Sequence, residues 1–202
     1  MRPDVVAELR RKSIHVIPGF LAYPVIIYLG KPAALIISAF FLALYALNEV
    51  SLRKGLRIKV PIAYHTYRVM ARREELEGGY FTGTVYFWSL TLVTIALLEP
   101  LKAVAAVMVS SLGDAAAAIT GKALGGARLP FNRRKTVAGS LAMFAVSMVS
   151  CLLVGLPPSL SAVVAAVATV AEALTRSSVL DELTVPLAVL ATLLLAHKDF
   201  LL

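Results

Sequence analysis

Long apolar stretches without any charge dominate this chain and constrain its fold more than any other feature. They cover residues 35–47, 81–98, 103–113, 137–170 and 183–196. A helix needs about 20 residues to cross the ~30 Å hydrocarbon core of a bilayer. Hydrophobic residues make up 59% of the 202 positions and charged residues only 16%, whereas soluble domains are nearer one half and one quarter. The sequence therefore predicts an all-α, polytopic integral membrane protein with a single domain over residues 1–202.

We expect about seven membrane spans, joined by short turns and one longer connection. They are expected at about 14–29, 33–49, 81–98, 102–121, 137–156, 160–174 and 183–197. Pro18-Gly19 and Pro186 predict kinks in the first and last spans, which neighbouring helices can accommodate. The connection 51–80 is expected to contain an interfacial helix. The chain has no Gln and only two Asn, a depletion typical of thermophilic proteins.

The distribution of Lys and Arg predicts the orientation of the spans. Seventeen of these residues lie in the N-terminal segment and in the connections after the second, fourth and sixth spans, and three lie on the opposite side. Basic connections face the cytoplasm, so the N-terminus is expected there. The net charge of +8 then forms a cytoplasmic skin that attracts anionic lipid, and nucleic acid is not an expected partner.

Unusual polar groups gather at the span ends expected to face the cytoplasm. They are His15, Asn48, Glu49, Asp114, Thr136, Glu172, Asp181 and Glu182. Asp114 still lies inside an apolar run, where a charge costs roughly 2.5–3.5 kcal/mol and usually has a role. A solvated helix end is the alternative for Glu49 and Glu182. Interfacial anchoring is the alternative for His15, because an amphipathic ring suits the headgroup layer.

The stretch from Asp114 to Gly139 combines groups that suit a magnesium–phosphate site. A carboxylate can hold Mg²⁺ while phosphates fill its other positions. Exposed backbone N–H groups at glycines can cradle phosphate oxygens, and basic side chains can neutralise a triphosphate. The members of this motif are Asp114, Ala117, Ala118, Gly121, Gly125, Arg133, Arg134, Lys135, Thr136 and Gly139. The residues alone thus predict an anionic-ligand site on the cytoplasmic face.

Helix packing is the alternative interpretation of the same glycines. The spacing Gly121-x-x-x-Gly125 matches the motif of membrane helix dimers, so a homodimer is a second expectation. The Gly-x-x-x-x-Gly-Lys-Ser/Thr pattern of a P-loop is absent from the sequence.

The motif resembles the CTP-binding signature of dolichol kinases, Asp-x-x-Ala-Ala-x-x-Gly-x-x-x-Gly-x8-Lys-Lys-Thr-x-Glu-Gly. The matches, at identical spacing, are Asp114, Ala117, Ala118, Gly121, Gly125, Lys135, Thr136 and Gly139. Arg134 replaces the first Lys, which keeps the charge but changes the donor geometry, and Ala138 replaces the Glu. The chain looks closer to the broader set of CTP-dependent lipid kinases, which includes phytol kinases and diacylglycerol kinases.

Three further segments are similar to this family, in the right order along the chain. "LRRKSIHVIPG" (9–19) resembles its N-terminal Arg-Lys-x-x-His element, and "EGGYFTGTVYF" (77–87) resembles its third-helix entry. "EALTRSSVLDELTVPLA" (172–188) resembles its closing element, with Glu182 where Asn is usual.

The resemblance implies transfer of the γ-phosphoryl group of CTP to a lipid alcohol: dolichol or another polyprenol, phytol or geranylgeraniol, or diacylglycerol. It implies Mg²⁺ at Asp114, with Glu172 or Asp181 as a second carboxylate. His15 or Asp181 would accept the alcohol proton, and Lys12 would contact phosphate. The triphosphate would be held by Ala117, Ala118, Gly121, Gly125, Arg134, Lys135, Thr136 and Gly139. The lipid tail is expected in an alanine-rich groove between the fourth, fifth and sixth spans.

Two other functions remain open from the sequence. A phosphatidate cytidylyltransferase would use the same nucleotide but transfer its nucleotidyl part and release pyrophosphate. An ion-coupled transporter could use Asp114 as its coupling site. A transporter should, however, place polar groups near the midplane with access from both sides, whereas here they gather on one face.

Overall fold

The structure is a computed structural model that describes residues 2–56, 58–177 and 179–196. The described residues form helices and turns with no β-strand, apart from one isolated bridge between Arg128 and Thr136. The predicted all-helical class is therefore confirmed. Arg57, His197 and Lys198, which entered the charge and span predictions, lie outside the described residues.

Helices cover every predicted span, with edges that differ by a few residues. They are α1 Pro3–His15, α2 Ile17–Tyr23, π-helical η1 Pro24–Tyr28, α3 Lys31–Arg53, α4 Ala63–Met70, α5 Arg73–Gly78, α6 Thr82–Leu97, α7 Pro100–Met108, π-helical η2 Val109–Gly113, α8 Asp114–Leu124, α9 Val137–Leu153, α10 Pro158–Leu174 and α11 Asp181–Leu195. The first predicted span is divided between α2 and η1. The fourth is one continuous helical rod made of α7, η2 and α8. Two short helices, α4 and α5, occupy the long connection.

Proline and glycine set several of these boundaries. Pro32, Pro100 and Pro158 stand in the first turns of α3, α7 and α10, where the missing N–H group is not needed. Gly30 and Gly155 have φ of 86° and 90°, a backbone conformation that L side chains rarely adopt. Tight turns therefore form at both positions.

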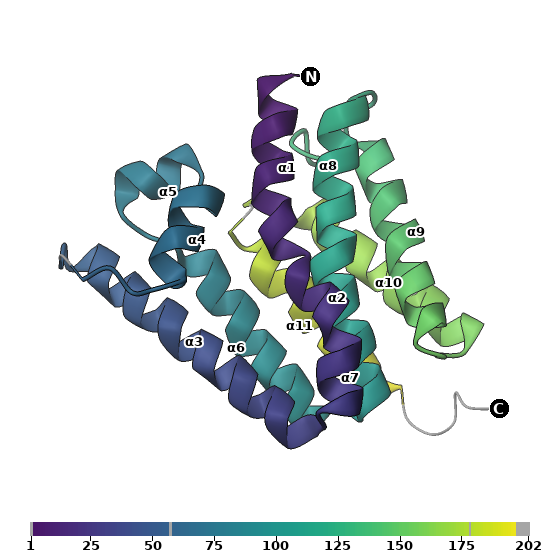
Figure 1. The fold of residues 1–202 in the computed structure, drawn as a ribbon. Coiled ribbons are helices and arrows are strands. Elements are labelled where there is room, and N and C mark those ends of the chain that lie inside the picture. The colour runs from purple at the N-terminus through teal and green to yellow at the C-terminus, as the bar shows by residue number, and fades with distance from the viewer. Residues whose placement is uncertain (1, 57, 178, 197–202) are drawn as a thin grey trace.

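The α7–η2–α8 rod lies at the centre of the helix arrangement (Figure 1). α1 runs beside α8, α9 and α10 pack on the other side of α8, and α3 pairs with α6 at the opposite edge. The N-terminus, α4, α5 and the α8–α9 connection lie at one end of the molecule. The turns η1–α3, α6–α7 and α9–α10 lie at the other end. The strongly basic segments of the sequence therefore share one end.

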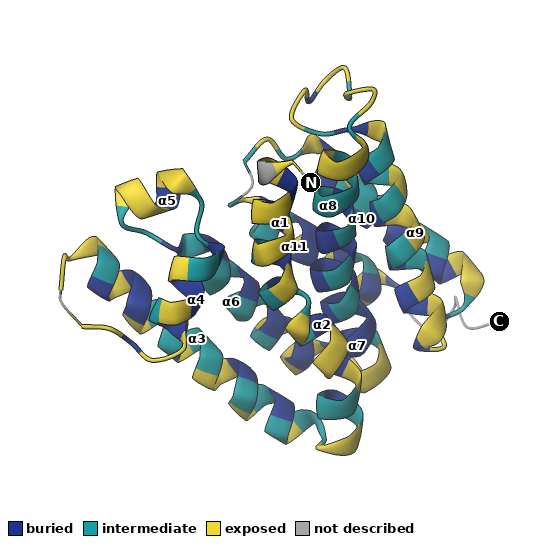
Figure 2. Ribbon diagram, turned by 45° about the horizontal axis from the view of Figure 1, so that its top comes forward, coloured by how far each residue is buried: buried dark blue, intermediate teal, exposed yellow. Residues whose placement is uncertain are grey.

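Two helices are long and apolar enough to cross a membrane: α3, and the rod from Pro100 to Leu124. The best window of the rod is 61% buried within the protein, but that of α3 is only 28% buried. Figure 2 shows exposed positions along the outer helices and buried positions along the rod. Large apolar side chains remain exposed on many helices; examples are Phe20, Tyr28, Ile36, Phe40, Leu141, Leu153 and Leu195. A surface of this kind suits a lipid environment better than water.

The polar half of α1 is fixed to α8 by a buried carboxylate. Glu8 pairs with Arg11 on its own helix and with Lys122 of α8, whose Nζ lies 2.6 Å from a Glu8 carboxylate oxygen. Burial raises the pKa of Glu8, but Arg11 and Lys122 outweigh that effect and lower the pKa from 4.5 to about 2. The ionised carboxylate therefore stabilises the folded state above pH ~4.5, and this contribution is lost as the pH falls towards 2.

Replacing Glu8 should test this link between α1 and α8. Glu8→Gln leaves Lys122 and Arg11 without their acid and is expected to cost about 1–3 kcal/mol of stability at neutral pH. Thermal unfolding in detergent, measured from pH 7 to pH 3, should show the gap between wild type and variant narrowing as the pH falls. A gap that stays constant over this range would contradict the role given to the Glu8 charge.

Candidate functional site

A buried cluster of four side chains forms where α1, α8 and α11 meet. Lys12 forms a salt bridge with Asp114, and its side chain is only 2% exposed. His15 Nε2 lies 3.3 Å from Asp114 Oδ2 and 3.7 Å from Glu182 Oε2. Taken one from each, ligand atoms of His15, Asp114 and Glu182 all lie within 4.8 Å of one another. A cation could therefore be shared by these three residues.

The π-helical turn η2 sets the direction of Asp114. It ends at Gly113, and Asp114 is the first residue of α8. The Ser111 hydroxyl in η2 donates a 2.5 Å hydrogen bond to the His15 carbonyl at the end of α1. This bond joins the two segments that carry the cluster. Single π-helical turns within α-helices are frequent at functional sites.

A second charged cluster lies at the ends of α10 and α11. Lys135 Nζ is 2.6 Å from Glu172 Oε1 and 2.8 Å from Asp181 Oδ2. Burial by itself lowers the pKa of Lys135, but the carboxylates of Asp181 and Glu172 outweigh it and hold that pKa above its ordinary value. Lys135 is therefore a fully charged ammonium group, fixed between two acids.

The connection 125–136 is held in place by polar contacts to the α10–α11 turn. The Asn132 amide donates to the carbonyls of Ala173 and Thr175, at 2.8 and 2.9 Å, and so satisfies free acceptors at the end of α10. Arg134 donates to the Arg176 carbonyl at 3.1 Å. The guanidinium groups of this connection thus remain near the surface, while Lys135 turns inward.

Two of the motif glycines lie in a helix–helix contact. A Cβ at Gly139 would stand 2.9 Å from the Ala117 carbonyl, and a Cβ at Gly121 would stand 2.9 Å from Thr136 Oγ1. Thr136 caps α9 by accepting a 3.1 Å hydrogen bond from Gly139 N–H. These three residues and Ala117 therefore bring α8 and α9 close together, which is the packing interpretation of the motif.

Gly125 differs from the other motif glycines. Its φ is 63°, and a Cβ there would meet nothing within 4 Å. Its backbone conformation, and not crowding, therefore requires glycine. Among the motif glycines, Gly125 is the one whose backbone remains open to a ligand. Ala118 is partly exposed on α8, unlike the buried Ala117.

The structure divides the sequence-predicted residues into three groups. Lys12, His15 and Asp114 meet in the first cluster. Glu172, Asp181 and Lys135 meet in the second. The third group lies at the α8–α9 contact or on the connection above it: Ala117, Ala118, Gly121, Gly125, Arg134, Thr136 and Gly139.

Glu182 is the site residue that the sequence interpretation undervalued. It was expected to be less secure as a ligand, because Asn is usual at its place in the resembled family. In the structure Glu182 lies beside His15, whereas Glu172 contacts Lys135. The pairing of Asp114 with Glu172 at one metal therefore has less geometric support than the pairing of Asp114 with Glu182. The available signal was the adjacent acid pair Asp181-Glu182 at a helix start, where the two side chains point to different clusters.

The first cluster fits a divalent cation by its donor set. Two carboxylates suit Mg²⁺, which also retains water or phosphate ligands. The imidazole of His15 is a softer donor, which suits Mn²⁺ and other transition metals as well. Lys12 already pairs with Asp114, so a bound cation would share or replace that ammonium group.

An apolar cavity of about 310 Å³ opens beside the first cluster. His15 and Glu182 lie in its wall, and the rest of the lining comes mainly from α2, α3 and α6. The predicted lipid groove between the fourth, fifth and sixth spans is not where this cavity lies. The alanines there are used for close packing of α8 and α9, which leaves the larger space at the wider α2–α3–α6 crossing.

Comparison of the chain with protein-family models, curated proteins and solved structures finds no match.

The α8–α9 contact can be tested with one added methyl group. Gly139→Ala places a Cβ against the backbone of Ala117, which cannot move easily, so we expect a loss of about 1–3 kcal/mol. Thermal unfolding in detergent measures the effect. Ala145→Val, on the exposed side of the same helix, is the matched control and should change stability by less than ~0.5 kcal/mol. Equal effects of the two variants would argue against close packing at Gly139.

The metal interpretation distinguishes two neighbouring acids. Glu182→Gln should weaken Mn²⁺ binding, followed by electron paramagnetic resonance, by at least ~10-fold. Glu172→Gln should leave it almost unchanged, because Glu172 contacts Lys135. A larger loss in Glu172→Gln would instead favour the pairing of Asp114 with Glu172.

Proposed function

We propose that this chain is an integral membrane kinase that transfers the γ-phosphoryl group of CTP to a lipid alcohol. The observation that carries the proposal is the position of the Lys12–His15–Asp114–Glu182 cluster. It borders an apolar cavity on one side, and the same helices α8 and α11 lead to the Lys135 cluster on the other. A water-soluble nucleotide and a lipid could thus reach one set of acids from different directions.

The level of the cluster along the bundle supports a site at the membrane boundary. Asp114 lies beside His15, the last residue of the polar helix α1, and ten residues before the end of α8. Ten residues of helix extend about 15 Å. Most of α8 therefore runs alongside the charged α1 and not alongside apolar spans. With the N-terminus in the cytoplasm, as the basic residues predict, the site would face the cytoplasmic leaflet.

The nucleotide side of the proposed site is the connection 125–136. Lys135 is oriented by its two acids, and Arg133 and Arg134 lie at the exposed rim. Phosphoryl transfer needs charge neutralisation and alignment more than covalent catalysis. These cations would hold the triphosphate, with the open backbone of Gly125 as a further phosphate contact. The choice of CTP as donor rests on the resemblance of the motif.

The acceptor side contains two candidates for the group that takes the alcohol proton. His15 and Glu182 line the cavity and also face Asp114. His15 Nε2 points at two carboxylates, which favours a proton on that nitrogen and suits orientation of a hydroxyl. A carboxylate of the cluster, foremost Glu182, is then the better proton acceptor. Asp181, which the sequence suggested for this role, instead pairs with Lys135.

A divalent ion, when bound, would neutralise charge on the transferring phosphoryl group. Asp114 and Glu182 would hold it, and Lys12 would keep the unoccupied site electrically balanced. The chain's own contribution is therefore to bury opposite charges at one point, exclude water from it and align two substrates.

Labelled nucleotides test the proposal. Purified protein is incubated with γ-³²P-CTP or α-³²P-CTP and a panel of polyprenols, phytol, geranylgeraniol and diacylglycerol. Label should reach lipid from the γ position alone. Label from the α position would indicate cytidylyl transfer instead. Label from neither position with any lipid would contradict the kinase and leave the transporter as the function to test.

The Asp114 carboxylate should be indispensable to this activity. Asp114→Asn keeps the shape but removes the charge, and it should lower the transfer rate by roughly 10²–10³-fold. Glu77→Gln is the matched control, because Glu77 is an exposed acid paired only with Arg73, and such surface pairs contribute little. An active Asp114→Asn variant would exclude Asp114 from the chemistry.

A further inference from the structure

We infer that the cavity between α2, α3 and α6 holds the hydrocarbon tail of a single-chain lipid alcohol, with the hydroxyl group at His15 and Glu182. The position of the hydroxyl rests on the proposed function. The position of the tail rests on the shape and lining of the cavity alone.

The lining of the cavity is polarised from one end to the other. Its charged residues are Arg11 and Lys12 of α1, Glu182 of α11, and Arg72 and Glu75 of the segment around α5. All of them lie at the level of His15. The opposite end is formed by apolar residues from the far ends of the helices: Val25, Ile26, Ala34, Ile95 and Val107. A molecule with one polar end and one apolar tail matches this distribution.

The dimensions of the cavity favour one chain over two. The helical path from His15 to Ile26 is eleven residues, or about 16 Å. A volume of about 310 Å³ equals roughly ten water molecules at ~30 Å³ each, and a methylene group is of similar size. One chain of about ten carbons fills this space. A longer isoprenoid would extend from it into the bilayer, and a diacylglycerol would have to leave one chain outside.

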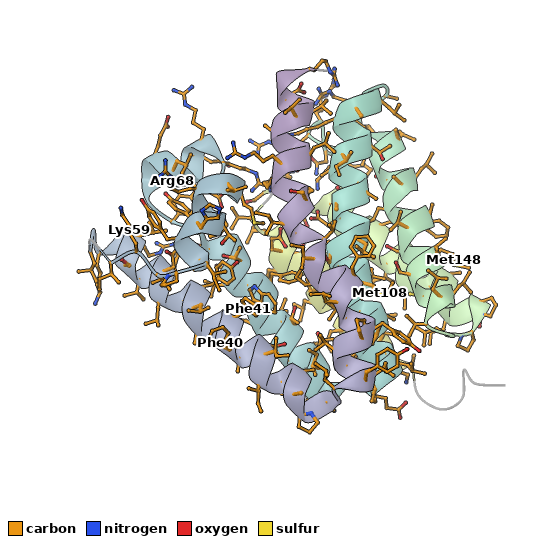
Figure 3. The ribbon with its side chains drawn as sticks, in the orientation of Figure 1. Phe40, Phe41, Lys59, Arg68, Met108 and Met148 are labelled. Atoms are coloured by element: carbon orange, nitrogen blue, oxygen red, sulfur yellow. The ribbon has the colours of Figure 1, made fainter. Side chains whose placement is uncertain are left out.

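Aromatic side chains form one wall. Phe41 of α3 stacks on Trp88 of α6 with ring centroids 4.6 Å apart, and Phe87 packs edge-on against Trp88 at 5.6 Å. Figure 3 labels Phe41 and its neighbour Phe40 on α3. Phe41 lines the cavity, whereas Phe40 is 55% exposed on the outer side. Phe87 also contacts the His15 ring at 5.2 Å. The aromatic wall is therefore continuous with the charged cluster.

The mouth of the cavity is suited to a phosphorylated head group. Arg11 and Arg72 both line it. Burial and the nearby Arg11 charge lower the pKa of Arg72, as expected for two cations that face one another. A phosphate group at the mouth would relieve that repulsion. The same end of the cavity thus suits both the alcohol and the phosphate made from it.

Because hydrocarbon is already available in the bilayer, the tail gains little hydrophobic free energy on entering the cavity. Selection must therefore come from shape. Narrowing the cavity should exclude the tail without affecting the nucleotide side.

The single tryptophan of the chain, Trp88, lines the cavity and reports directly on its contents. The probe is 9,10-dibromo-octadecanol, whose bromine atoms quench tryptophan fluorescence on contact, added to the full-length protein in detergent micelles. We expect saturable quenching that unbrominated octadecanol reverses. A dibrominated phosphatidylcholine at the same concentration should quench less and not be displaced by octadecanol.

Two alanine variants of α3 provide the matched pair. Ala34 is 1% exposed and lines the cavity, so Ala34→Phe should raise the alcohol concentration for half-maximal quenching by at least about tenfold. Ala39 is exposed on the same helix, and Ala39→Phe should leave quenching unchanged. Ser38→Leu, a smaller obstruction in the same wall, replaces Ala34→Phe if that variant does not fold by circular dichroism.

The outcomes separate this inference from the proposed function. Saturable quenching without phosphoryl transfer would support the tail site and overturn the kinase. Transfer that is equally efficient in wild type, Ala34→Phe and Ser38→Leu would support the kinase and overturn the tail site. Quenching of wild type that does not saturate, or that octadecanol does not reverse, would also overturn the tail site.

Discussion

A carboxylate buried in the middle of a helical bundle must be compensated, and much of this structure is arranged around that requirement. Asp114 is 6% exposed and is paired with Lys12 and His15 of the N-terminal helix. An unpaired charge in such a place would cost several kcal/mol. The requirement places α1 against α8. The Glu8 ion pairs and the Ser111–His15 hydrogen bond reinforce the same contact.

The same pairing has a functional implication. Lys12 stabilises the protein when no cation is present, and it occupies the acid that a cation would use. Buried charges kept at a stability cost are typical of active sites. The protein therefore has two charged arrangements available at one point, and binding of nucleotide with its metal would shift it from one to the other.

Much of the fold could be predicted from the sequence, because hydrophobic runs and proline positions are local signals. Each predicted span coincides with a helix, and the extra helices in residues 51–80 follow the same logic. The site could be predicted only in part. Lys12, His15 and Asp114 meet as expected, but the partners of Glu172 and Glu182 depend on how α10 and α11 turn, which no local pattern specifies. Gly121 and Gly139 carry the same sequence signal for packing and for phosphate binding, and only the close approach of the helices distinguishes the two.

The π-helical turn before Asp114 has a consequence for sequence change in this region. A π-helical turn accommodates one more residue than an α-helical turn, so η2 can be regarded as an α-helix that carries one inserted residue. Removing a single residue between 109 and 113 would restore regular winding and rotate everything that follows by about 100°. Asp114 would then leave His15, and Gly121 would turn away from Gly139. The register of this five-residue segment therefore couples the charged centre to the packing of α8 on α9, so a length change here would alter both at once even if every side chain in the site were kept.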